Sequence, residues 1–118
     1  WATFTPERLD RAFKEHKTVV MIFTAEWCLN CKALEQSVWG NPELVKLMSG
    51  PSVVPIKVDL TGDNPEGRKM LQEGGSLTIP LLLIYKPDGQ PVLRSDFYTA
   101  TQVVEALRES PAASPPKP

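Results

Sequence analysis

The sequence predicts an α/β fold in which a mixed central β-sheet is flanked by helices on both faces. Apolar runs at residues 18–24, 53–60 and 81–85 are nearly continuous, which is typical of strands buried on both faces. Helical patterns alternate with these runs, and a strand–helix–strand unit of this kind forms a right-handed parallel crossover. The 118 residues suffice for one domain core but not for two.

The first helix is expected between Thr5 and about Lys17. Thr5 can cap it, Pro6 suits its first turn, and Glu7 suits the positive end of the helix dipole. The strand at 18–24 follows and ends shortly before two cysteines.

A long helix is expected next, and Cys28 is placed at its beginning. Cys31, Leu34 and Val38 recur at helical spacing. Residues 40–42 (GNP) interrupt this helix and supply a new cap, after which the apolar pattern continues to 48. Two helices that meet at the interruption are therefore predicted.

The second half of the chain completes the sheet. In the strand at 53–60, Pro55 favours pairing that begins only after it. A helix is expected from residues 63–66 (DNPE) to the pair Gly74-Gly75. The strand at 81–85 then turns at residues 87–90 and returns antiparallel at 92–94.

The last helix is expected after a capping box at residues 99–102 (TATQ), with Phe97 and Tyr98 packing it onto the sheet. The tail from Ser110 carries four prolines and few apolar residues. We therefore expect one domain at 1–109 and a Pro-rich, disordered tail at 110–118.

Composition narrows the class of partner. The formal net charge is −1, which favours neither nucleic acid nor an anionic membrane as a partner. No apolar run approaches the roughly 20 residues that span a bilayer, so no membrane insertion of this segment is expected. Trp1 stands where an initial methionine would be, and we interpret this as a sign that a signal, a tag or a larger protein preceded it.

The two cysteines, Cys28 and Cys31, favour redox chemistry. A disulfide that closes so short a loop restricts the unfolded chain little and so stabilises the fold little. Two cysteines and the single His16 cannot complete a four-ligand zinc site. No metal and no cofactor are expected, because the electrons would reside in the two sulfur atoms.

The predicted position of Cys28 gives it reactivity. Unpaired backbone N–H groups at a helix N-terminus carry partial positive charge and favour a thiolate over a thiol. Cys31 lies one turn later, where its sulfur can reach that of Cys28. We therefore expect Cys28 to attack a disulfide and Cys31 to resolve the mixed disulfide.

Residues 25–32 (AEWCLNCK) resemble the active-site segment of the thioredoxin superfamily. Residues 78–80 (TIP), just before a strand, resemble the cis-proline loop of that family. The resemblance covers about residues 4–109 and implies a thioredoxin-like fold and thiol–disulfide oxidoreductase activity. It also implies that Trp27, Ile79 and Pro80 contact the substrate.

Within this superfamily the sequence is most similar to the C-terminal periplasmic domains of the DsbD thiol:disulfide interchange proteins. The segment from Cys31 to Glu35 continues to Trp39 and then to residues 41–42 (NP), as in their longer, interrupted helix. Gln36 stands where ordinary thioredoxins carry a proline. Residues 29–30 (LN) replace their Gly-Pro.

One position departs from the family pattern. Thioredoxins and DsbD-type domains usually bury an aspartate six residues before the first cysteine, and Ile22 occupies that position here. Glu35 matches a second acidic position of the DsbD-type domains. The resemblance therefore implies that Glu35 is a catalytic residue that handles the proton of the second cysteine alone.

The resemblance also implies partners and a compartment. We expect a monomer that reduces protein disulfides and takes electrons from a thiol donor, such as a membrane-embedded DsbD-type domain. A periplasmic or other extracytoplasmic bacterial location follows. Two alternatives stay open: a general thioredoxin, against which Gln36 and residues 29–30 argue, and a non-catalytic thioredoxin-fold interaction module whose cysteines are incidental.

Overall fold

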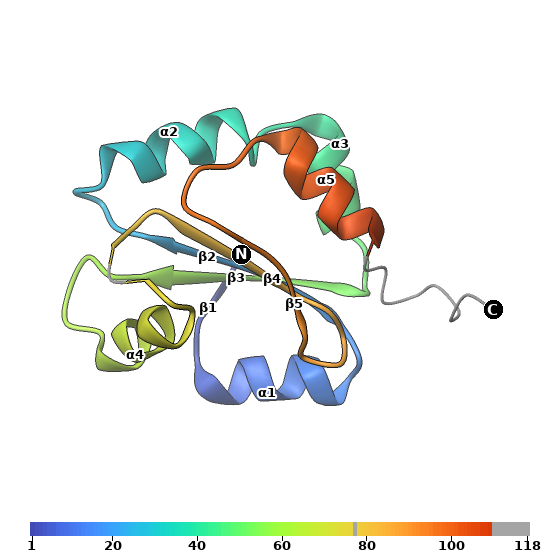
Figure 1. Ribbon diagram of the computed structural model, residues 1–118, viewed down its shortest axis with the longest axis horizontal. Coiled ribbons are helices and arrows are strands. Elements are labelled where there is room, and N and C mark those ends of the chain that lie inside the picture. The colour runs from blue at the N-terminus through green and yellow to red at the C-terminus, as the bar shows by residue number, and fades with distance from the viewer. Residues whose placement is uncertain (77, 110–118) are drawn as a thin grey trace.

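The computed structural model describes residues 1–76 and 78–109 and contains a five-stranded sheet in the order β1-β3-β2-β4-β5 (Figure 1). β1 and β2 run parallel to β3, whereas β4 runs antiparallel to both β2 and β5. The strands are β1 (Ala2–Thr3), β2 (Thr18–Thr24), β3 (Val53–Asp59), β4 (Leu81–Tyr85) and β5 (Pro91–Ser95). The predicted mixed sheet is confirmed.

Helices cover both faces of the sheet, as predicted. α2, α3 and α5 lie on one face, and α1 and α4 lie on the other (Figure 1). Their bounds are α1 (Pro6–Lys14), α2 (Leu29–Ser37), α3 (Pro42–Met48), α4 (Pro65–Glu73) and α5 (Ala100–Glu109). Within the described part of the chain, none of these helices combines the length and the apolar character needed to cross a bilayer. The predicted tail at 110–118 lies outside the described residues.

Three helices begin with the same local signal. Thr5, Asn41 and Asn64 each cap a helix by accepting a hydrogen bond from the backbone N–H three residues later. A proline follows each cap in the first turn, where its missing N–H costs no hydrogen bond. The predicted interruption between α2 and α3 is thus confirmed.

β2 forms the centre of the core. All seven of its residues are buried, and its side chains alternate between two apolar clusters. Met21 and Phe23 pack with residues of α1 and α4, whereas Val20 and Ile22 pack with residues of α2, α3 and α5. Because β2 is held from both faces and by two neighbouring strands, its carboxyl end is a rigid base for the segment that follows.

The prediction for Pro55 is wrong. β3 pairs with β2 from Val53 onward, so Pro55 lies inside the ladder, opposite Val20. β1 reaches β3 only at Ile56 and Lys57. At Pro55 the strand therefore has one paired side, which is the setting in which a strand tolerates a residue without an N–H.

Tyr98 packs α5 onto the sheet, as predicted, and gives the fold a measurable pH dependence. Its ring is 4% exposed, and burial, with the negative charge of Glu35 as a smaller cause, raises its pKa to about 12. Ionisation is then easier in the unfolded chain, where the pKa is near 10. We expect the free energy of unfolding to fall by about 2–3 kcal/mol as the pH rises from 10 to 12.

Denaturant unfolding at several pH values measures this loss. The matched variant is Tyr98→Phe, which keeps the ring and removes the ionisable hydroxyl. The other tyrosine, Tyr85, also has a pKa raised by burial, but it is present in both proteins and cancels in the comparison. An equal loss in the variant would contradict the assignment to Tyr98.

Candidate active site

Cys28 lies at the N-terminus of α2, directly after the central strand. The chain leaves β2 at Thr24, turns, and places Cys28 as the cap of the helix. The Sγ of Cys28 accepts a hydrogen bond from the backbone N–H of Cys31 at 3.2 Å. The sulfur thus occupies the position in which a serine or aspartate oxygen caps other helices, and the partial positive charge of the helix end falls on it.

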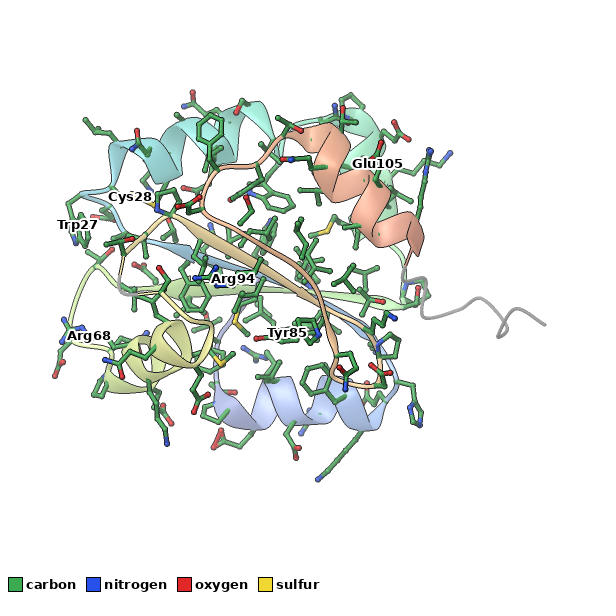
Figure 2. The ribbon with its side chains drawn as sticks, in the orientation of Figure 1. Trp27, Cys28, Arg68, Tyr85, Arg94 and Glu105 are labelled. Atoms are coloured by element: carbon green, nitrogen blue, oxygen red, sulfur yellow. A yellow bond between two sulfur atoms is a disulfide. The ribbon has the colours of Figure 1, made fainter. Side chains whose placement is uncertain are left out.

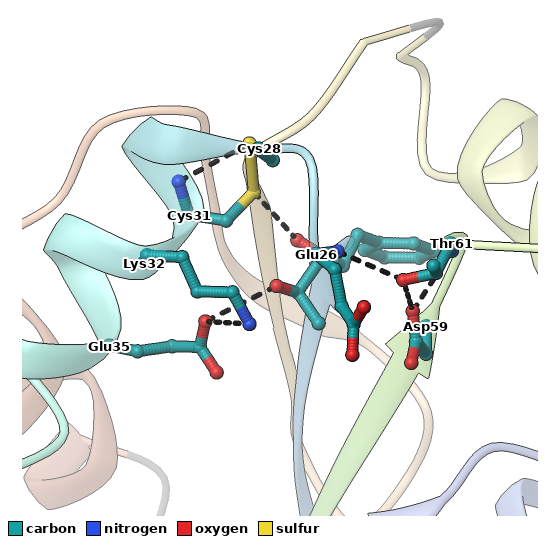
Figure 3. The surroundings of a disulfide bond; sticks show 9 residues. Glu26, Cys28, Cys31, Lys32, Glu35, Asp59 and Thr61 are labelled. Atoms are coloured by element: carbon teal, nitrogen blue, oxygen red, sulfur yellow. Dashed lines mark hydrogen bonds and ion pairs between the residues drawn. A yellow bond between two sulfur atoms is a disulfide. The ribbon is translucent and has the colours of Figure 1, made fainter.

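Cys28 and Cys31 form a disulfide, with their Cα atoms 5.2 Å apart (Figure 3). Both residues are largely buried, and Cys28 is the more exposed at 7% against 3%. The sulfur of Cys31 points back toward β2, where it lies 3.7 Å from the carbonyl oxygen of Phe23. In the reduced protein this oxygen can accept a hydrogen bond from the Cys31 thiol.

The loop from α4 to β4 brings Ile79 against the disulfide. Ile79 packs on the cluster formed by Ala25, Cys28 and Cys31. The Ile79–Pro80 peptide bond is cis, as the resemblance implied. Ile79 and Trp27, two of the predicted substrate-binding residues, line the same hollow of about 420 Å³.

Pro80 faces a second hollow, of about 250 Å³. This hollow is lined by residues of α2, including Asn30 and Leu34, and by Phe97 from the segment between β5 and α5. The loop that packs Ile79 against the disulfide thus contributes Ile79 to one hollow and Pro80 to the other. A polypeptide that crosses this loop can place side chains on both sides of it.

Glu35 lies one helical turn after Cys31 and is held in place by residues of the sheet. Thr24 donates its hydroxyl to Oε2 of Glu35 at 3.3 Å, and Lys57 donates to Oε1 at 3.2 Å. Lys32, on the same helix, lies 3.9 Å from Oε2 (Figure 3). With 23% of its side chain exposed, Glu35 is a fixed carboxylate at the carboxyl end of β2 rather than a freely solvated helix residue.

The profile of a family described as thioredoxin-like matches residues 1–87, which is more than half of the chain. The chain belongs to the thioredoxin-like family. The family accounts for the arrangement just described, in which a Cys-x-x-Cys pair opens a helix after a central strand.

Several curated relatives of this thioredoxin-like chain share one name. A thiol:disulfide interchange protein DsbD from Pseudomonas fluorescens is 32% identical over 81 residues, which are 69% of this chain and 14% of that protein. A DsbD from Neisseria meningitidis is 30% identical over 102 residues, or 82% of this chain and 16% of that protein. The chain thus spans about one sixth of the length of these relatives.

Solved structures with the same fold include a domain of a DsbD protein and a thioredoxin. The oxidised C-terminal domain of Neisseria meningitidis DsbD superimposes with a TM-score of 0.68 at 26% identity, covering 93% of this chain and 99% of that one. A thioredoxin from Thermus thermophilus has a TM-score of 0.70 at 21% identity, covering 92% of this chain and 85% of that one, and supports the fold alone. The predicted fold class and the resemblance to DsbD-type domains are confirmed.

The position that usually holds an aspartate in thioredoxins is apolar in this thioredoxin-like chain. Ile22 is 2% exposed and packs in the cluster beneath α2, with Leu34 and Leu82. Position 22 of β2 therefore offers no carboxylate, and the carboxylate at the carboxyl end of β2 is that of Glu35, on the helix. Lys57, which lies opposite Ile22 in the ladder, turns its ammonium group to that helix carboxylate.

A second hydrogen-bonded group fixes the turn before Cys28. The backbone N–H of Glu26 donates to the hydroxyl of Thr61 at 2.9 Å. Thr61 in turn donates its hydroxyl and its N–H to Asp59, and these bonds lower the pKa of that carboxyl. The turn is thereby tied to the end of β3 (Figure 3).

The exposure of Phe97 beside the active-site helix was not predicted from the sequence. Phe97 was expected to pack beneath the last helix, yet it is 77% exposed, and this part of the prediction is wrong. With Leu29 at 82% and Trp27 at 65%, it is one of the three most exposed large apolar side chains of the described residues. All three border the disulfide segment, so the surface around Cys28 is apolar.

Proposed function

We propose that this chain is a thiol–disulfide oxidoreductase domain that reduces protein disulfides and relays electrons through the Cys28–Cys31 pair. One observation carries the proposal: the sulfur of Cys28 caps the N-terminus of α2 beside a surface open to a partner. A helix N-terminus stabilises a thiolate, and the thiolate is the nucleophile of disulfide exchange. The activity named in the relatives supports the same chemistry.

The first half of the cycle forms a mixed disulfide. A thiol donor first reduces the Cys28–Cys31 disulfide to a dithiol. The Cys28 thiolate then attacks one sulfur of the partner's disulfide, and the partner's other sulfur leaves as a thiolate and takes up a proton. Cys28 and the partner are now linked by a disulfide.

The second half releases the partner. We propose that Glu35 accepts the proton of the Cys31 thiol, directly or through a water molecule. The Cys31 thiolate attacks the sulfur of Cys28, and the partner's bound sulfur leaves as its second thiol. The Cys28–Cys31 disulfide forms again, and two electrons have passed to the partner.

Partner binding is assigned to the two hollows and the loop between them. Trp27 and Ile79 line one hollow and Pro80 lines the other, so a partner segment laid across the loop contacts all three. The exposed Leu29 and Phe97 add apolar surface, which favours a protein over a small thiol as the acceptor.

The proposed function also indicates a cellular compartment, an electron donor and an oligomeric state. Protein disulfides persist mainly in oxidising compartments, and the DsbD name of the relatives favours the bacterial periplasm. The electron donor is proposed to be a thiol-bearing domain, membrane-embedded as the resemblance implies. The domain is proposed to act as a monomer.

A reductase assay with a protein disulfide tests the function. We expect the chain to accelerate the reduction of a protein disulfide by a dithiol, and Cys28→Ser to return the rate to that of the uncatalysed reaction. Circular dichroism of the variant controls for folding. A wild-type chain that shows no acceleration, and whose cysteines reach no dithiol–disulfide equilibrium with glutathione, would favour the non-catalytic interaction module.

A further inference from the structure

Ile79 packs against the disulfide, and Gly74, Gly75 and Ser76, which precede it in the chain, close the C-terminal end of α4. The N–H groups of Gly74, Gly75 and Ser76 return to carbonyls of the last helical turn at 2.9, 2.9 and 3.2 Å. The carbonyls of the two glycines point away from the helix and need donors from elsewhere. What supplies those donors determines how firmly this end of the helix is held.

Arg94 of β5 supplies them. Its Nε donates to the carbonyl oxygen of Gly74 and its Nη2 to that of Gly75. Figure 2 shows Arg94 beside the end of α4. A guanidinium is a rigid planar fork, so two bonds from one side chain fix both carbonyls relative to β5. Arg94 is paired with Leu83 in the sheet, which anchors the fork to β4.

The two glycines fit this arrangement closely. A Cβ on Gly74 would lie 2.8 Å from Cδ1 of Leu83, and one on Gly75 would lie 3.1 Å from Nε of Arg94. Gly75 also has a φ of 86°, which favours glycine. The helix end therefore lies against β4 and β5 with no room for side chains, so that the guanidinium reaches the backbone.

Hydrogen bonds between Ser76 and Thr78 connect the residues bonded by Arg94 to the part of the chain that contacts the disulfide. Ser76 accepts a hydrogen bond from the N–H of Thr78 at 3.2 Å and donates its hydroxyl to the carbonyl of Thr78 at 3.0 Å. Thr78 and Ile79 both line the hollow that also contains Trp27. Among residues 1–76 and 78–109, Arg94 makes no ion pair, so the two carbonyls are its polar partners.

We propose that Arg94 is a positioning residue that fixes Gly74 and Gly75, and through Ser76 and Thr78 the position of Ile79, and so sets the affinity for protein partners. The inference rests on the proposed function, because the position of Ile79 matters only if a partner lies across it. Arg94 touches neither sulfur atom, so it acts on partner binding and not on the reactivity of Cys28. A small disulfide, which does not need the hollow, is indifferent to it.

The test compares Arg94→Met with the wild type on two substrates. We expect KM for a protein disulfide to rise about tenfold with kcat little changed, because the loosened residues must be ordered on binding. The rate with a small symmetrical disulfide and the titration of the Cys28 thiol stay as in the wild type. Arg94→Lys, with one donor centre in place of the fork, is expected to fall between the two.

A matched control is Arg108→Met, because Arg108 is also exposed and bonds Glu43 on the far side of the domain. It should leave both substrates unaffected. An unchanged KM for the protein disulfide in Arg94→Met, or an equal loss on both substrates, would overturn the proposal. Amide hydrogen exchange at residues 76–79 tests the role of Arg94 independently of the proposed reductase function. Faster exchange in Arg94→Met would show that these residues are loosened even if the chain proves to have no reductase activity.

Discussion

The variant Cys31→Ser is expected to accumulate a mixed disulfide between Cys28 and its partner protein. Cys28 keeps its place at the helix N-terminus and can still attack, but no thiol remains to displace the captured partner. Serine has nearly the size of cysteine and sits in a position that is 3% exposed, so the fold should tolerate the change. Release then depends on external thiols, and the lifetime of the adduct should rise by orders of magnitude.

Non-reducing electrophoresis and mass spectrometry of a bacterial periplasmic extract measure this adduct. A band that contains both chains, and that disappears with dithiothreitol, identifies the partner as well. The double variant Cys28→Ser, Cys31→Ser is the control, because it lacks both thiols. Failure to recover an adduct, with a known protein disulfide also left untouched, would contradict the roles assigned to the two sulfurs.

Local signals in the sequence were enough to predict the helices, four of the five strands and the cysteine site, whereas the short β1 at Ala2–Thr3 was not predicted. The caps at Thr5, Asn41 and Asn64 act within three residues, so their meaning does not depend on the rest of the fold. The same holds for Cys28, whose role as a cap follows from its place between a strand and a helix. The continuous apolar run of β2 predicted a strand buried on both faces, and all seven residues are buried.

Contacts between distant segments could not be predicted in this way. Lys57 reaches Glu35 because β3 pairs with β2 in one particular register, and Arg94 reaches Gly74 because β5 follows β4 at the sheet edge. Neither register is encoded near the residues that it brings together. Lys57 is one of two charged side chains in the run of β3, and a charge between two apolar neighbours is a signal that could have singled it out.

The adjacent residues Phe97 and Tyr98 show a further limit of prediction from the sequence. Phe97 and Tyr98 are both aromatic and similar in size, yet only Tyr98, the more polar of the two, is buried. Ser95 fixes this difference by bonding the N–H and the carbonyl of Phe97 at 3.3 and 2.7 Å. Composition cannot separate the two residues; the turn geometry does.

The variant Glu35→Gln is expected to slow the release of the partner about 100-fold while leaving the first attack by Cys28 almost unchanged. Glutamine has the same size. Its amide oxygen can still accept the hydrogen bond of Lys57, and its amide N–H can donate to the hydroxyl of Thr24, so the packing at the end of β2 is kept. What it loses is the ability to accept a proton from the Cys31 thiol. The two steps are therefore affected differently.

Rapid-quench kinetics with a labelled protein disulfide resolve the two steps as formation and decay of the mixed disulfide. Glu105→Gln, a change of the same kind on the exposed face of α5, controls for loss of a negative charge. If both steps slow equally, Glu35 acts through the fold or through the general field of the site. If neither slows, another group or solvent takes the proton.

Because the residue at position 22 of β2 is apolar, Glu35→Gln is a decisive test of where the proton of Cys31 goes. In a site with two carboxylates, one on the strand and one on the helix, either could receive the proton when the other is removed. Here Ile22 fills the strand position, 2% exposed and packed in an apolar cluster, and its side chain cannot accept a proton. A large, selective loss of partner release in Glu35→Gln would therefore place the whole proton transfer on the helix carboxylate.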